Sequence, residues 1–162
     1  MGISFGSTGI KPYVGSKEVQ EAYVGSQLVY KSGPPDNWIF IGEETSYFLS
    51  SDSELLTGTA IVKEGGIYRV SLAQKSTNGL KINTLKPGKL KFTAKGRGLN
   101  STRTGYVQWR NASGNPTGST SFISGNDKYE LQTLSPSSTA VSCVIFSDAQ
   151  SPIYIDSIRF EE

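Results

Sequence analysis

The sequence predicts an all-β protein: an N-terminal β-hairpin or meander module followed by an antiparallel β-sandwich of the jelly-roll type. Short runs of alternating apolar and polar residues recur through residues 38–162 at the spacing typical of sandwich strands. Turn residues such as Lys86-Pro87-Gly88 separate these runs. No stretch sustains the periodicity of an amphipathic helix, so we expect strands throughout.

The chain is expected to divide at a stiff linker. Residues 32–37 read Ser-Gly-Pro-Pro-Asp-Asn, and consecutive prolines cannot donate hydrogen bonds inside a sheet. We therefore predict a hairpin-repeat module over 1–31, the linker over 32–37 and the sandwich over 38–162. A chain of 162 residues has the length of one ordinary domain with an appendage.

The first module repeats one motif. Tyr-Val-Gly-Ser at 13–16 returns at 23–26. Glycine at the first central position suits a type II′ hairpin turn, so we expect strands near 10–14, 17–24 and 27–31. A sheet this small has little core to offset the entropy lost on ordering, and we expect it to dock or oligomerise. The candidate docking residues are Tyr13, Val14, Val19, Tyr23, Val24, Leu28 and Tyr30.

The sandwich strands follow from the alternating runs after the linker. The final run, PIYIDSIRF, alternates throughout, which would place Ile153 and Ile155 on one face and Ile158 and Phe160 on the other. The predicted strands are Trp38–Ile41, Tyr47–Leu49, Gly58–Val62, Tyr68–Ala73, Gly79–Ile82, Lys89–Ala94, Tyr106–Arg110, Ser121–Ile123, Tyr129–Leu134, Ala140–Phe146 and Ile153–Phe160.

Composition argues against several classes of function. The absence of histidine removes the Ser-His-Asp and Cys-His catalytic arrangements and the usual zinc sites, and no enzymatic activity is expected. The single cysteine, Cys143, lies in the apolar run AVSCVIF and reads as a small buried hydrophobe. No run approaches the roughly 18 apolar residues of a membrane span, and MGISFGSTG lacks the features of a signal peptide.

Charge is segregated along the chain, although the net charge is only +2. Residues 65–126 carry ten bases and no acid, whereas 36–64 sum to −5 and 127–162 sum to −4. The positive stretch could meet an anionic partner, form a head-to-tail contact between copies, or scatter over separate strands without a specific role. Nucleic acid is not the expected partner, because few aromatic residues interleave the bases.

One sandwich strand carries the candidate glycan-binding residues. Tyr106, Gln108 and Arg110 share one face of the strand and make a polar platform, and Trp109 could stack on a pyranose ring. A solvated sheet face and a buried core position for Trp109 are the alternatives. Trp38 follows the linker and could pack the first module onto the sandwich or contact a glycan.

The order of motifs over residues 58–160 resembles the jelly-roll carbohydrate-binding modules of the galactose-binding-like group. The runs that carry the resemblance are LKFTAKG at 90–96, YVQW at 106–109 with the turn at 111–114, the strands near 129–134 and 141–146, and IYIDSI at 153–158. In such modules the first acid of the closing strand helps to hold a structural calcium ion, so the resemblance implies Asp156 as its ligand. Ser157 stands where the family pattern has a second acid.

The segment ISFGSTGIKPYVGSKEVQEAYVGSQLVYKS resembles leader modules of virion structural proteins of tailed bacteriophages. That resemblance implies a non-catalytic virion protein (a capsid decoration, head fibre or tail component) that docks through its repeat and displays a carbohydrate-binding-like domain. The implied partners are other virion proteins, copies of the chain itself as a homo-oligomer such as a trimer, and a surface glycan. A virion protein made in host cytoplasm needs neither signal peptide nor disulfides. The alternative is a soluble glycan-recognition module that binds through surface aromatics.

Overall fold

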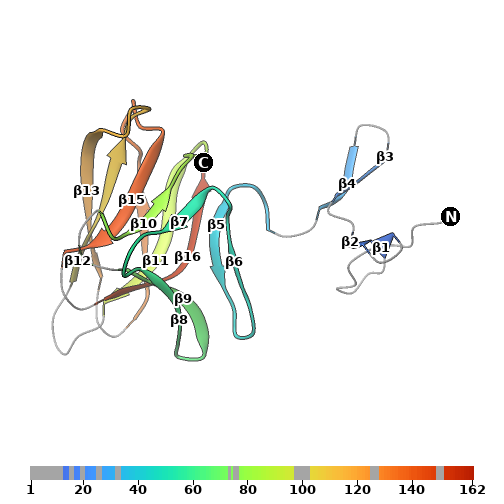
Figure 1. The fold of residues 1–162 in the computed structure, drawn as a ribbon, viewed down its shortest axis with the longest axis horizontal. Helices are drawn as coiled ribbons and strands as arrows, with labels where there is room; N and C mark the ends of the chain where they lie inside the picture. The colour runs from blue at the N-terminus through green and yellow to red at the C-terminus, as the bar shows by residue number, and fades with distance from the viewer. Residues whose placement is uncertain are drawn as a thin grey trace. The chain divides into compact units, whose positions relative to one another are not determined.

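The computed structural model describes the backbone of four short strands before residue 32, and then residues 34–72, 74, 77–96, 103–124, 128–148 and 152–162 (Figure 1). The chain forms two compact units, Met1–Pro35 and Asp36–Glu162. All regular structure in the described ranges is β, which confirms the predicted fold class. Accordingly, these ranges hold no helix with the length and hydrophobicity of a membrane span.

The first unit contains two antiparallel hairpins. β1 (Tyr13–Val14) pairs with β2 (Lys17–Glu18), and β3 (Glu21–Val24) pairs with β4 (Gln27–Lys31). Val14 lies opposite Lys17 and Val24 opposite Gln27, and the predicted turn residues between them lie outside the described part of the chain. The single strand predicted over 17–24 is present as two, β2 and β3. Val19 and the side chains of the other candidate docking residues (Tyr13, Val14, Tyr23, Val24, Leu28 and Tyr30) lie outside the described part of the chain.

The second unit is a sandwich of two antiparallel sheets (Figure 1). The smaller sheet has five strands in the order β13-β12-β15-β10-β7. Its strands are β7 (Ser53–Leu55), β10 (Leu80–Ile82), β12 (Arg103–Arg110), β13 (Pro116–Ser124) and β15 (Ser142–Ser147).

The larger sheet has seven strands. Five lie in the order β14-β11-β16-β5-β6, and β9 pairs with both β16 and β8. Its strands are β5 (Trp38–Gly42), β6 (Tyr47–Leu49), β8 (Ala60–Glu64), β9 (Ile67–Leu72), β11 (Lys89–Gly96), β14 (Glu130–Leu134) and β16 (Ile153–Glu161).

The core lies between the two sheets. Alternate residues of each strand point inward, because successive side chains of a strand face opposite sides of the sheet. Phe92 of β11 meets Phe122 of β13 edge to face, with ring centroids 4.9 Å apart, and Trp109 lies in the same cluster. This aromatic packing joins the two sheets, and such pairs add to the free energy of simple burial.

A bulge in β16 changes which of its side chains are buried. Ile158 lies opposite Phe92 and Ile155 opposite Ala94. Between these two pairs β16 advances three residues while β11 advances two, so β16 has one extra residue. Strict alternation had predicted opposite faces for Ile155 and Ile158, and that prediction is wrong because the extra residue resets the alternation. Ile153, Ile155, Ile158 and Phe160 are therefore all in the core.

Candidate functional site

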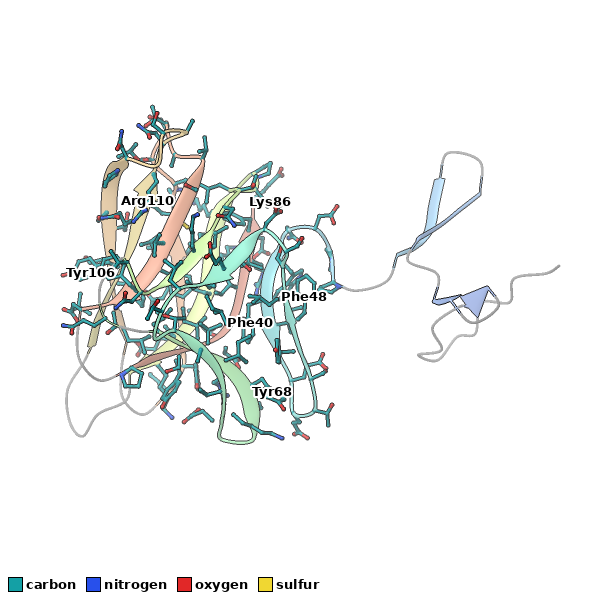
Figure 2. The ribbon with its side chains drawn as sticks, in the orientation of Figure 1. Phe40, Phe48, Tyr68, Lys86, Tyr106 and Arg110 are labelled. Carbon is teal, nitrogen blue, oxygen red and sulfur yellow. The ribbon has the colours of Figure 1, made fainter. Side chains whose placement is uncertain are left out.

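The outer face of the five-stranded sheet gathers three of the four candidate glycan-binding residues. In β12, Val107 and Trp109 point into the core, so the residues between and beyond them, Tyr106, Gln108 and Arg110, point outward and are half-buried. Figure 2 shows Tyr106 and Arg110 on the β12 side of the sandwich, whereas Phe40 and Tyr68 belong to the other sheet. The predicted common face is therefore present in the structure.

An aromatic pair lies at one end of this face. Tyr106 is opposite Phe146 of β15 in the sheet register. Their rings are stacked, with centroids 5.5 Å apart and planes inclined by 23°. Ser121 of β13 flanks Tyr106 on the other side and is exposed. Two aromatic rings and a serine hydroxyl group therefore lie next to one another at this end of the face.

Polar and charged groups occupy the rest of the face. Gln108 lies between Ser119 of β13 and Val144 of β15. The Arg110 Nη2 donates a hydrogen bond of 3.0 Å to the Gln108 side-chain oxygen. Lys81 of β10 lies beyond Val144 and faces Glu54 of β7. We call the set Tyr106, Gln108, Arg110, Ser119, Ser121, Phe146, Lys81 the Tyr106 face.

Trp109 does not belong to the Tyr106 face. Its side chain is only 2% exposed, and the indole nitrogen donates a hydrogen bond of 2.9 Å to the Thr120 hydroxyl. The prediction that Trp109 stacks on a sugar is therefore wrong, since its position in β12 is one residue out of phase with Tyr106. Trp38 is half-buried on β5, where the Arg159 guanidinium carbon lies 5.0 Å from its ring centroid.

Asp156 does not fit a structural calcium site. The Arg69 Nε lies 3.3 Å from the Asp156 Oδ1, so a fixed positive charge already occupies the position that a cation would take. Among the described residues, no three His, Cys, Asp or Glu side chains gather closely enough to hold a metal ion. The expectation drawn from the family resemblance is corrected: the β16 carboxylate pairs with an arginine.

A second polar cluster lies on the outer face of the seven-stranded sheet. The Tyr129 hydroxyl donates to the Glu64 carboxylate at 2.8 Å, and Arg69 and Lys95 lie 3.0 and 3.4 Å from the same carboxylate. The Arg69 guanidinium carbon also lies 4.3 Å from the Tyr129 ring centroid. Sequence reasoning missed this cluster, because Lys95 and Tyr129 are far in sequence from the β8–β9 hairpin that carries Glu64 and Arg69.

The cluster shifts the ionisation of two of its members. Burial raises the pKa of Tyr129, and its hydrogen bond to Glu64 raises it further, so this phenol stays protonated. Burial acts to raise the pKa of Glu64, but the Tyr129 hydrogen bond and the charges of Lys95 and Arg69 outweigh it and lower the pKa below 4.5. Hydrogen bonding and ion pairing thus hold this carboxylate in its charged form.

The charges that are segregated in the sequence pair with one another in the fold. Five bases of the 65–126 stretch lie 2.6 to 3.8 Å from a carboxylate of the flanking stretches. The pairs are Arg69 with Glu64 and Asp156, Lys81 with Glu54, Lys86 with Asp52, Lys91 with Glu161, and Lys95 with Glu64. Within the described side chains, the basic stretch is therefore largely neutralised and does not form one positive surface.

Two cavities lie outside the Tyr106 face. One of about 600 Å³ adjoins the β8–β9 turn, with Glu64, Ser71 and Tyr154 among its lining residues. The other, of about 350 Å³, includes Pro87 and Phe160 in its lining. Neither is lined by a residue of the Tyr106 face, so that face is a sheet surface rather than part of these hollows.

No family model matches the chain, and no curated protein matches it significantly. Three solved structures share its fold to a limited degree. The first contains the CBM22-1 and GH10 modules of Clostridium thermocellum endo-1,4-beta-D-xylanase 10B with xylohexaose, at 13% identity and a TM-score of 0.46 over 78% of this chain. The match covers 26% of that xylanase chain, so the present chain spans only about a quarter of the xylanase's length.

The second is the CBM22-1 xylan-binding domain of a Paenibacillus barcinonensis xylanase, at 10% identity and a TM-score of 0.42 over 75% of this chain and 85% of that one. The third is the enzymatically active domain of a bacteriophage CBA120 tailspike, at 15% identity and a TM-score of 0.40 over 77% of this chain and 19% of that one. At these identities and TM-scores the likeness carries no conclusion about ligand or activity.

Proposed function

We propose that the sandwich is a non-catalytic carbohydrate-binding domain and that the Tyr106 face is its binding surface. The observation that carries this proposal is the stacked Tyr106–Phe146 pair beside the Gln108–Arg110 hydrogen bond. An aromatic face suits the apolar side of a pyranose ring, while amide, guanidinium and hydroxyl groups suit its hydroxyls. Rigid strands hold these groups in place, which limits the entropy lost on binding.

A glycan array followed by titration calorimetry tests the proposal. Tyr106→Ala is expected to weaken binding of the best ligand by about tenfold, because the stacking surface is removed. Tyr47→Ala is the matched control, since Tyr47 is 52% exposed and belongs to the other sheet. Binding that is equally sensitive to both changes, or insensitive to Tyr106→Ala, would contradict the assignment. The absence of any bound glycan would refute the function itself.

The first unit is proposed to anchor the sandwich to a larger assembly. Its strand pairs β1–β2 and β3–β4 are two-stranded sheets with little area to bury by themselves. The resemblance of residues 1–31 to phage leader modules makes a bacteriophage particle the proposed assembly. Self-association through these hairpins would make the protein a homo-oligomer, with a trimer the simplest case for a fibre.

Deleting residues 1–31 separates the two roles. The deletion is expected to abolish oligomerisation and incorporation into particles but to leave glycan affinity unchanged. Light scattering after size exclusion measures the oligomeric state, and calorimetry measures the glycan affinity. A full-length chain that is monomeric and joins no particle would remove the anchoring role, while the carbohydrate role of the Tyr106 face would stand.

A further inference from the structure

The charge pairing across the fold leaves one guanidinium on the Tyr106 face without an acidic partner. Among the described bases of the 65–126 stretch, five pair with a carboxylate, and only Lys89 and Arg110 do not. Lys89 is exposed on the seven-stranded sheet, whereas Arg110 is half-buried beside the proposed sugar-binding residues. A positive charge has therefore been placed at the candidate site and left uncompensated there.

The hydrogen-bond donors of Arg110 are also incompletely used. Its Nη2 donates to Gln108, but its Nε is buried and has no hydrogen-bond partner among the described groups. A guanidinium carries five donors, so those that Gln108 does not use remain for a planar anion, which can accept two parallel hydrogen bonds. The Gln108 contact fixes the orientation of the guanidinium, so it is preorganised for such an acceptor.

The nearest other charges on this face do not supply that acceptor. Two strands, β15 and β10, lie between Glu54 and β12, and Glu54 pairs with Lys81 at 3.8 Å. This pair is partly exposed and contributes little energy, and its two opposite charges add almost no net charge to the face. The positive charge of Arg110 therefore has no acid beside it and favours an anionic group at that end of the face, whereas the exposed Asp148 lies beyond Phe146 at the other end.

The spacing of the face sets a minimum ligand length. Tyr106 and Arg110 are four residues apart on one strand, which corresponds to about 13 Å along β12. A single sugar ring stacked on Tyr106 does not span that distance. A ligand that touches both ends must be an oligosaccharide lying along β12.

We propose that the ligand of the Tyr106 face is an acidic oligosaccharide, with one sugar stacked on Tyr106 and the carboxylate of a uronic acid residue paired with Arg110. This assignment rests on the proposed carbohydrate-binding function and names the substrate class of that same surface. It also gives a role to the one half-buried base that the fold leaves unpaired among the described residues.

Matched polymers test the proposal with the full chain. The probes are polygalacturonate, alginate, hyaluronate and glucuronoxylan, each beside its counterpart in which the carboxyl groups are reduced to primary alcohols. Affinity gel electrophoresis finds the retained polymer, and calorimetry with its oligosaccharides gives the affinity. We expect at least one acidic polymer to be bound and its reduced form to bind about tenfold more weakly or worse, because a charge-assisted pair is lost.

Variants localise the effect. Arg110→Gln is expected to bind the acidic and the reduced polymer equally, Arg110→Lys to keep part of the preference, and Tyr106→Ala to lose both. Lys89→Gln removes the same charge from the opposite sheet and should leave the preference unchanged. Thermal unfolding of each variant checks that the fold is intact.

The outcomes distinguish this proposal from the function on which it rests. Binding to reduced and acidic polymers alike, with Tyr106→Ala still damaging, would overturn the acidic ligand and keep the carbohydrate function. An equal loss in Lys89→Gln and Arg110→Gln would show a general charge effect and overturn the Arg110 assignment. Retention by none of the polymers, acidic or reduced, together with an empty glycan array, would overturn both.

Discussion

Replacing Trp109 separates the core of the sandwich from its proposed binding surface. The side chain is only 2% exposed and belongs to the core cluster between the sheets. A buried aromatic side chain removes about 150–250 Å² from water, which at about 25 cal/mol per Å² corresponds to roughly 4–6 kcal/mol. The replacement alanine keeps a small part of this, so Trp109→Ala should cost about 3–5 kcal/mol of unfolding free energy.

Trp109→Phe is expected to cost less, about 1–2 kcal/mol, because much of the ring is retained. What it loses is the indole hydrogen bond, which leaves the Thr120 hydroxyl without that donor. Urea denaturation followed by circular dichroism measures both variants. For a domain of this size, the alanine variant should melt about 10–20 °C lower.

Glycan affinity provides the second readout of the same experiment. Trp109→Phe should bind like the natural chain, whereas Tyr106→Ala should lose affinity with little change in stability. If Trp109→Ala melted within about 2 °C of the natural chain and lost glycan binding, Trp109 would have to be a surface residue. That result would refute the inward orientation of Trp109. It would also refute the assignment of Tyr106, Gln108 and Arg110 to the outer face of β12.

Three further outcomes are expected. The Glu64→Gln variant should be less stable than the natural chain, most of all above pH 5. This stability difference should shrink as the pH falls below 4.5, because a carboxylate with a lowered pKa stabilises the fold only while it is charged. Urea midpoints measured across pH test this, and a pH-independent difference would contradict it. Gly42→Ala should cost more than about 3 kcal/mol, since a Cβ there would lie 1.7 Å from the Tyr68 carbonyl oxygen; near-normal melting would show that this approach can relax. Cys143 should resist a thiol reagent until the protein unfolds, because complete burial raises its pKa; rapid labelling of the native chain would disprove that.

The strands that sequence patterning found are those with a clear apolar signal, either continuous or alternating. Trp38–Gly42 and Tyr47–Leu49 begin where predicted, since apolar residues dominate both. Ser53–Leu55 was missed, because a three-residue edge strand with one apolar side chain leaves no periodic signal. Pro116–Ser124 was predicted only at 121–123, because its first half is small and polar and pairs through its backbone.

The candidate site was predictable only in part, and for a similar reason. The common face of Tyr106, Gln108 and Arg110 follows from alternation within one strand. The stacking of Phe146 on Tyr106 depends on the register between β12 and β15, which are separated by two other strands in the sequence. The bulge at residues 156–157, which resets the alternation of β16, depends on its pairing with β11 and leaves no local signal.

The central place of β16 in the larger sheet bears on how the protein is made. It lies between β11 on one side and β5 and β9 on the other. Until β16 has been synthesised, each of these three strands has one edge whose backbone groups are unpaired. A ribosome adding about 5–20 residues per second needs roughly 3–11 s to travel from Gly96 to Ile153. During that interval neighbouring nascent chains on one messenger present the same unpaired edges to each other. Slower initiation should therefore raise the yield of folded protein by keeping those nascent chains further apart.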